Sequence, residues 1–201
     1  MAAARDPEAT RAAILEAAEE VFLQRGFGAA SMSEIARRAG VTKSLLHHHF
    51  GSKRGLWKAI KMRRFSSYAD IQRRMLAEQE PTAELLRESM QAYFGLMRGT
   101  PELVRMMAWV VLERQDEAVD LDTELLRNGV DKVRQAQERG ELRADLNPCF
   151  ILFTFIGIVH HWFQDKDHML PPMGLSPDSS AVDDEYLENA VKIFFEGVLP
   201  R

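Results

Sequence analysis

Apolar residues recur every three to four positions along almost the whole chain, and no stretch alternates with the period of two that marks a β-strand. An amphipathic helix repeats its apolar face at this interval, so the pattern predicts an all-α fold. Glycine, proline and capping residues between the periodic stretches set the expected helix ends. The expected helices cover about 6–25, 32–39, 43–50, 53–77, 82–97, 101–115, 120–139, 148–165 and 183–198, with an exposed loop over 166–181.

The second and third expected helices are separated by a very short turn. Ser31 and Glu34 have the spacing of a capping box, in which the Ser31 hydroxyl accepts from a helix amide and Glu34 reaches back to the cap amide. Gly40 tolerates the left-handed conformation that often ends a helix, and Thr42 can cap the next helix after one intervening residue. This spacing predicts a helix-turn-helix, the motif whose second helix enters the DNA major groove.

The distribution of charge supports that prediction, although the formal net charge of −4 by itself argues against a nucleic-acid binder. Residues 1–65 carry 12 Lys and Arg against 6 Asp and Glu, whereas the rest of the chain carries 14 against 24. A basic end on an acidic body is typical of an arm that meets phosphate. We therefore predict a helix-turn-helix DNA-binding domain over 1–65, joined through a long helix to a helical effector-binding and dimerisation domain over 66–201.

A helical wheel of the third helix separates its core side from its outer side. Leu46 and Phe50 fall together and are expected to pack in a small core. Serine hydroxyl and histidine imidazole groups can hydrogen-bond to base edges, and an aliphatic side chain can contact a thymine methyl group. The residues on the outer side, which we expect to face the groove, are Ser44, Leu45, His47 and His48.

Several basic residues flank or follow the recognition helix. Lys43 and Lys53, at the starts of consecutive helices, are placed to meet phosphates, whereas Arg63 and Arg64 lie several turns away and are interpreted as exposed charge. The three consecutive histidines, residues 47–49, point about 100° apart on a helix and cannot converge on one ion. No metal site is predicted.

The segment GFGAASMSEIARRAGVTKSLLHHHFGSKRGLW resembles the N-terminal signature of TetR-family transcriptional regulators over about 50 residues. The resemblance implies that phosphate-contacting positions are occupied by Ser31, Thr42, Lys43, His47 and Lys53. It also implies that bases are read by Lys43, Ser44, Leu45 and His48. Ser44 stands where glycine is common and His47 where tyrosine is common. Because imidazole is shorter than phenol, we expect the His47 phosphate contact to be lost or to depend on pH.

The helix of residues 147–165, NPCFILFTFIGIVHHWFQD, is apolar on every side and must be buried all round. One face can cover its own domain, and we expect the other to meet a second copy of the chain. TetR-like proteins dimerise in this way, which places two recognition helices about 34–36 Å apart on DNA. The expected interface residues are Ile151, Ile158, His161, Trp162, Leu187, Val191, Phe194 and Phe195.

The middle helices are rich in methionine and aromatic residues, which usually form core. Ten methionines nevertheless suit an adaptable apolar cavity, and the resemblance implies that this region encloses a ligand. Either His160 or His161 is a candidate polar group for orienting a ligand, and each is equally well explained as a packed histidine. The expected lining residues are Phe94, Met97, Met107, Val110, Phe153, Ile156 and His160.

Several classes of protein are excluded. The single cysteine, Cys149, forbids an internal disulfide and a cysteine-based zinc site, and its apolar surroundings indicate a buried residue, not a nucleophile. No catalytic signature such as G-x-S-x-G or H-E-x-x-H is present, and no cofactor is predicted. Without a signal peptide or a spanning segment, a cytoplasmic location is expected.

We therefore predict a homodimeric, sequence-specific transcriptional regulator, in the first place a repressor that a small, mainly apolar effector releases from a palindromic operator. The alternatives are a transcriptional activator and a helix-turn-helix adaptor that binds a protein partner.

Overall fold

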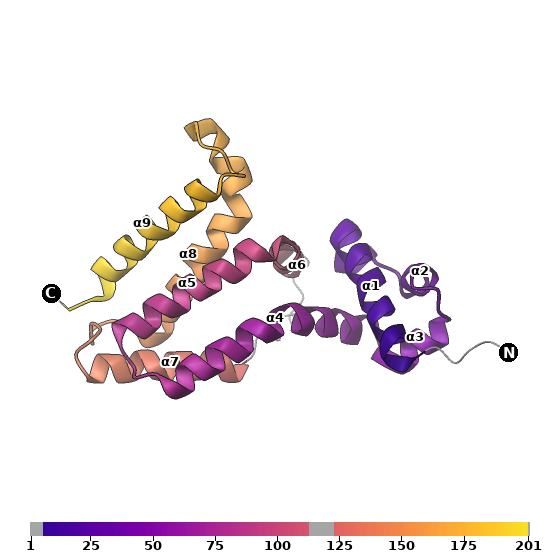
Figure 1. The fold of residues 1–201 in the computed structure, drawn as a ribbon, viewed down its shortest axis with the longest axis horizontal. Helices are drawn as coiled ribbons and strands as arrows, with labels where there is room; N and C mark the ends of the chain where they lie inside the picture. The colour runs from indigo at the N-terminus through magenta and orange to yellow at the C-terminus, as the bar shows by residue number, and fades with distance from the viewer. Residues whose placement is uncertain (1–5, 113–122, 201) are drawn as a thin grey trace. The chain divides into compact units, whose positions relative to one another are not determined.

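The computed structural model describes residues 6–112 and 123–200, with the side chains of residues 110 and 111 excepted. All regular structure in these ranges is helical, in agreement with the predicted fold class (Figure 1). The α-helices are α1 (Pro7–Ala29), α2 (Met32–Arg38), α3 (Lys43–Phe50), α4 (Lys53–Glu78), α5 (Ala83–Gly99), α6 (Pro101–Leu112), α7 (Thr123–Glu138), α8 (Pro148–Met169) and α9 (Ser180–Val198), and a 3-10 turn, η1, covers Pro171–Met173.

The chain folds into two compact units. Unit 1 contains the residues up to Ser66 and a second stretch that starts at Arg105, and unit 2 contains Ser67–Val104 and the residues from Leu121 onward. The part of α6 from Arg105 onward therefore belongs to the same unit as the helix-turn-helix. The sequence had instead indicated that all of α6 lies in the C-terminal domain. Met106 is fully buried in the core of unit 1, and the Arg105 guanidinium donates to the Leu23 carbonyl at 3.0 Å. In a segment this short, the spacing of apolar residues predicts a helix but does not indicate which unit the helix packs in.

The core of unit 1 is built on the apolar stripe of α1. Ile14, Ala18 and Phe22 are fully buried, and the Trp57 ring from α4 meets the Phe22 ring edge-on at a centroid distance of 4.8 Å. Such edge-to-face pairs add to the stabilisation from burying both rings. The regular path of α1 breaks at Gly26, whose φ of 74° is costly for any residue with a Cβ atom. The predicted end of the first helix falls at this break.

The turn between α2 and α3 forms as the sequence predicts. Gly40 has a φ of 63°, and the Val41 amide donates to the Ala36 carbonyl at 3.0 Å. The Thr42 hydroxyl accepts from the Leu45 amide at 3.2 Å and so caps α3. These bonds fix the direction in which α3 leaves the turn.

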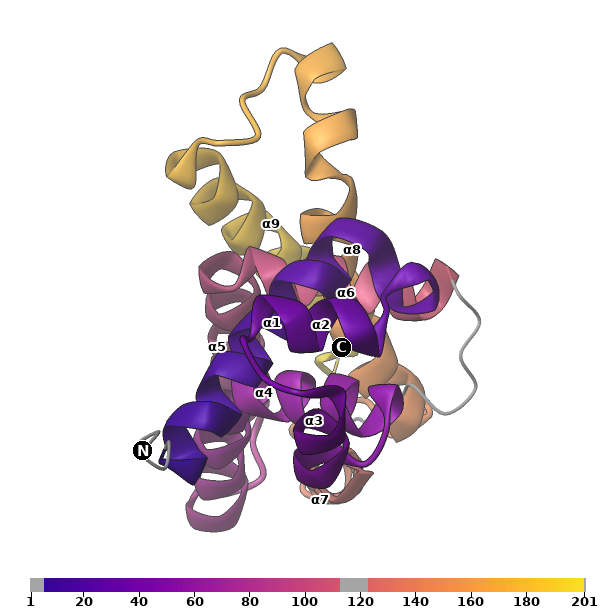
Figure 2. The ribbon, with the colours of Figure 1, turned by 90° about the vertical axis from the view of Figure 1, so that its right-hand side faces the viewer.

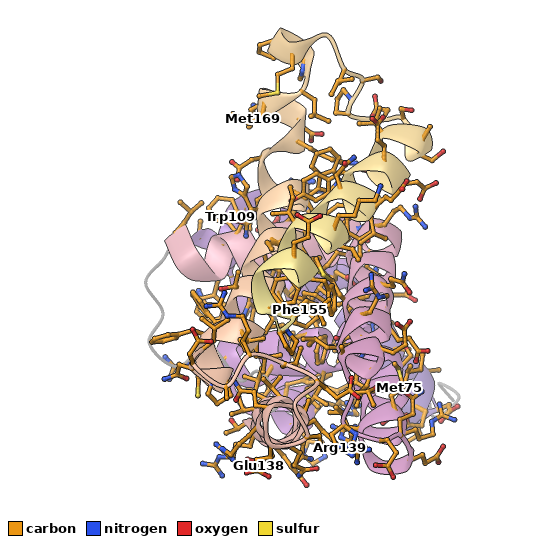
Figure 3. All side chains as sticks on the ribbon, turned by 90° about the vertical axis from the view of Figure 1, so that its left-hand side faces the viewer. Met75, Trp109, Glu138, Arg139, Phe155 and Met169 are labelled. Atoms are coloured by element: carbon orange, nitrogen blue, oxygen red, sulfur yellow. The ribbon has the colours of Figure 1, made fainter. Side chains whose placement is uncertain are left out.

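In unit 2, α5 packs against α8 and α9, and α7 packs against α8. Phe155 of α8 lies in the middle of this helical body, Met169 lies near one end, and Arg139 at the close of α7 lies at the other (Figure 3). The residues of α8 that are buried inside the chain are Ile151, Phe155, Val159 and Trp162. Among the helices that the structure describes, none is both long enough and apolar enough to cross a membrane.

The connection between α8 and α9 is shorter than predicted. The expected loop began at residue 166, but α8 continues to Met169, and α9 begins at Ser180 with Ser179 as its cap. The buried carboxylate of Asp183 accounts for this, because it accepts from Trp162 Nε1 at 2.7 Å and from Lys166 Nζ at 3.0 Å. These bonds hold the last turns of α8 against the start of α9, in a stretch that reads as polar loop.

Candidate nucleic-acid interface and effector region

The recognition helix α3 packs one side in the core of unit 1 and leaves a mainly polar side exposed. Leu46 is fully buried in the core of unit 1, and Phe50 is partly buried against it. Figure 2 faces the side of unit 1 that carries α2 and α3. Every residue that the sequence assigned to DNA on this helix is exposed, namely Lys43, Ser44, Leu45, His47 and His48. The exposed leucine is compatible with apolar contact to a base.

His47 has one ring nitrogen engaged within its own chain. Its Nδ1 lies 2.8 Å from the Gly51 carbonyl oxygen, which can only accept, so Nδ1 carries a hydrogen. In the neutral ring, Nε2 is then an acceptor and repels a phosphate oxygen. Only the protonated ring offers an Nε2–H donor. A phosphate contact at this position therefore requires the charged form of His47.

Lys53 makes a different contact from the one predicted. Its ammonium donates to the carbonyls of Phe27 at 2.7 Å, Gly28 at 3.0 Å and Ala30 at 3.1 Å. It also lies 4.6 Å from the centroid of the Phe27 ring. An ammonium has three N–H donors, and all three are used. Lys53 thus ties the first residue of α4 to the chain that follows the break in α1, and the structure does not support its assignment to phosphate.

The capping box at the start of α2 is incomplete. Ser31 is the N-cap residue, but its exposed hydroxyl makes no capping hydrogen bond. The Glu34 carboxylate does not reach back to the cap, because it pairs with Arg25 and Arg38, each at 3.1 Å. Two cations compete successfully for that carboxylate, which the spacing of Ser31 and Glu34 alone could not show. The Ser31 hydroxyl stays available to a phosphate.

Arg63 and Arg64 are both engaged in ion pairs within unit 1. Both guanidiniums pair with the Glu19 carboxylate of α1, Arg64 through Nε at 2.6 Å. Glu19 is 5% exposed, and a carboxylate this buried requires such partners. The arrangement fastens α4 to α1 at a second point. Arg63 is exposed as predicted and Arg64 is partly buried, but both are ion-paired, which the sequence did not predict.

The residues expected to line an effector site differ in burial. Phe94 and Met97 are buried, and Met107 and Ile156 are partly buried. Phe153 is 73% exposed and points away from the interior, so its assignment to the lining is wrong. The Val110 side chain lies outside the described residues.

His160 lies at the interior of unit 2. Its Nε2 is hydrogen-bonded to the Tyr93 hydroxyl, and burial lowers the pKa of His160 below its usual value. Burial also raises the pKa of Tyr93, and burial together with the neighbouring Tyr93 raises that of Tyr68. Tyr68, Tyr93 and the buried Gln72, which also belong to this region, were not predicted from the sequence. The spacing of Tyr68 and Gln72, one turn apart on α4, was the signal that could have found two of them.

Most of the expected dimer residues are already covered by their own chain. The buried ones are Ile151, Trp162, Val191, Phe194 and Phe195, while Leu187 and Ile158 are partly buried. His161 is exposed, with Nδ1 2.9 Å from an Asp165 carboxylate oxygen. Among the large apolar side chains that α8 and α9 leave exposed, the most exposed are Phe150 at 67%, Phe153 at 73% and Ile193 at 71%, followed by Met169 at 50%. A helix apolar on all sides gives no sign of which side α5 and α7 cover.

Cys149 is exposed, so its assignment as a buried residue is wrong. Cys149 stands in the first turn of α8. Within the described residues, no three metal-ligating side chains gather at one place.

Two family models match the chain, one for each part. The model of bacterial regulatory proteins of the tetR family matches residues 14–60, and that of the tetracyclin repressor-like C-terminal domain matches residues 86–192. The first match covers α2, α3 and the start of α4, where the recognition residues lie.

The curated relatives include both repressors and an activator of transcription. The repressor BepR of Brucella suis is 30% identical over 175 residues, which cover 78% of this chain and 82% of BepR. The activator FasR of Mycolicibacterium smegmatis is 36% identical over 97 residues, which cover 48% of this chain and 44% of FasR. The chain thus matches less than half the length of the activator.

Solved structures share the fold. The transcriptional regulator SCO4942 from Streptomyces coelicolor superimposes with a TM-score of 0.72 at 21% identity, over 94% of this chain and 98% of that one. AibR, solved with isovaleryl coenzyme A and operator DNA, gives a TM-score of 0.65 at 22% identity, over 92% and 97%. The resemblance seen in the sequence is confirmed, and so is the exclusion of catalysis, since regulators of this family are not enzymes. The chain belongs to the TetR family of bacterial regulatory proteins and is a DNA-binding transcriptional regulator.

Proposed function

We propose that this regulator is a homodimeric repressor that binds a partly palindromic operator and releases it when a small effector occupies unit 2. The observation that carries the proposal is the outer side of α3. Five residues that suit DNA contact are exposed there, on a helix that Leu46 and the Thr42 cap hold in place. The similarity to BepR over most of its length favours repression.

The proposed DNA contacts follow from exposure and chemistry. Thr42, Lys43 and the Ser31 hydroxyl meet phosphates, and protonated His47 adds a further contact through Nε2. The base readers are Ser44, Leu45 and His48, with Lys43 close enough to contribute. Lys53 is left out because its donors are used within the chain. The protein acts in the cytoplasm, where the operator lies.

The proposed dimer uses the apolar side chains that the chain leaves uncovered on α8 and α9. Phe150 and Phe153 on α8 and Ile193 on α9 are each more than 60% exposed. Large aromatic groups gain much from burial, and aromatic residues are enriched in interface centres. A two-fold axis through this surface would present two recognition helices to successive major grooves.

In the proposed switch, an effector in unit 2 shifts the equilibrium between two arrangements of the dimer. The shift equals the difference in effector affinity for the two arrangements. Both α4 and α6 contribute residues to unit 1 and to unit 2, so each is a route by which the effector influences α3. Release of the operator follows when the two copies of α3 lose the spacing of the grooves.

Activation is the second candidate, because FasR is an activator. The test selects fragments of the source genome with the purified protein and measures affinity by fluorescence anisotropy. Repression predicts a selected site that overlaps a promoter and a reporter whose expression rises when the regulator gene is deleted. A fall in expression would establish activation, and failure to enrich any sequence would contradict operator binding and favour the protein-adaptor alternative.

A further inference from the structure

Unit 2 contains a buried hydrogen-bond donor that has no acceptor among the described residues. Gln72 on α4 is 4% exposed, and no acceptor lies within hydrogen-bond distance of its side-chain nitrogen in the described part of the chain. Nearly all buried polar groups in folded proteins have a partner, because a donor removed from water without an acceptor is destabilising. An unpaired donor in an effector domain is therefore a sign of a ligand acceptor.

The surroundings of Gln72 are aromatic. Gln72 follows Tyr68 by one helical turn and so lies on the same face of α4. The Tyr68 ring lies 5.3 Å from that of Tyr93 on α5, and the Tyr93 ring lies 6.0 Å from that of Phe155 on α8. Figure 3 shows Phe155 in the middle of this helical body. Three helices thus contribute a connected row of aromatic rings that begins one turn from Gln72.

The polar groups of this region are uncharged. The Tyr93 hydroxyl and His160 Nε2 satisfy one another, and burial favours the neutral form of both. The buried carboxylate that unit 2 contains in its described residues is Asp183, which Trp162 and Lys166 already occupy. Neither Tyr93 nor His160 offers a counter-charge to a charged ligand group, which would also lose its hydration here.

We propose that the effector is a neutral, mainly apolar molecule with a carbonyl-type oxygen, such as a ketone, ester, lactone or amide, that accepts a hydrogen bond from Gln72 Nε2. Tyr68, Tyr93 and Phe155 pack against its apolar part. This assignment rests on the proposed effector site in unit 2, and it adds the chemical class of the effector and the residue that selects it.

The test uses three probes of one shape on the full-length protein. Butyrophenone is neutral with a carbonyl, butylbenzene lacks the acceptor, and 4-phenylbutanoate is charged. Isothermal titration calorimetry at pH 8 is expected to show butyrophenone binding about tenfold more tightly than butylbenzene, the effect of about one buried hydrogen bond. The carboxylate is expected to bind most weakly. Equal affinities for ketone and hydrocarbon, preference for the carboxylate, or no binding by any probe would overturn the proposal.

The Gln72→Leu variant separates recognition from structure. It is expected to bind butyrophenone about tenfold more weakly, to bind butylbenzene as before, and to unfold at a temperature no lower than the wild type, because an unpaired donor has been removed. The matched control is Gln91→Leu at an exposed position of α5, which should change neither property. Retained ketone preference in Gln72→Leu would refute the role of the amide.

A structural role for Gln72 makes the opposite prediction about stability. A lower unfolding temperature in both Gln72→Leu and the length-matched Gln72→Met would show that the amide has a partner in the protein, and would overturn the inference. Operator binding is measured separately by anisotropy without any probe. A protein that binds DNA but no ketone retains the proposed function and loses this inference. A protein that binds the ketone through Gln72 but enriches no DNA retains this inference and loses the proposed function.

Discussion

Replacing Lys53 by methionine tests whether this residue holds unit 1 together or meets DNA. Methionine keeps the length and apolar stem of the side chain but removes the ammonium that donates to the carbonyls of Phe27, Gly28 and Ala30. The contacts to Phe27 and Ala30 are part-buried, whereas that to Gly28 is exposed. The first two carbonyls regain hydration only in part when the ammonium is lost.

The expected loss of stability follows from these contacts. A part-buried hydrogen bond to a charged group contributes about 1–2 kcal/mol, and the cation over the Phe27 ring adds about 0.5 kcal/mol. We therefore expect Lys53→Met to lower the free energy of unfolding by about 3 kcal/mol. A lysine that only meets phosphate would leave it unchanged, because exposed substitutions without partners usually alter stability by less than about 0.5 kcal/mol.

Two measurements distinguish these roles. Urea unfolding at one fixed protein concentration gives the stability, and anisotropy with a selected DNA fragment over a range of salt gives the slope of log affinity against log salt. Lys53→Met should lose stability and keep the wild-type slope. The control, Lys43→Met at the exposed start of α3, should keep its stability and reduce the slope by about 0.9. Unchanged stability with a reduced slope in Lys53→Met would refute the reasoning and return Lys53 to the phosphate contacts.

Three further predictions concern separate parts of the molecule. Glu19→Ala leaves two guanidiniums without their shared carboxylate, so urea unfolding should show a loss of about 2–3 kcal/mol, and a loss below 0.5 would contradict the role of this pair. His47→Phe, which removes both ring nitrogens, should weaken operator binding about equally across sequences, and an unchanged affinity would exclude the His47 phosphate contact. Phe153→Asp should shift sedimentation from dimer to monomer, while an unchanged dimer would place the interface elsewhere.

The local parts of the fold and the exposed side of α3 could be predicted from the sequence. The glycine turn at Gly40, the Thr42 cap and the division between buried Leu46 and exposed Leu45 all depend on residues within one or two helical turns. Within that range, backbone geometry fixes which side chains are neighbours, so the periodicity of the sequence contains the answer.

Tertiary structure alone decided the roles of residues whose partners are distant in sequence. Lys53 lies 26 residues from Phe27, Arg63 lies 44 from Glu19, and Tyr93 lies 67 from His160. Their charge and polarity were visible in the sequence, but the groups that satisfy them were not. The packing of α8 was also decided by tertiary structure. Its sequence is apolar on every side, which predicts burial but does not show which side the other helices of its own chain cover. Local periodicity specifies the faces of a helix, and only the packing of helices determines what each face meets.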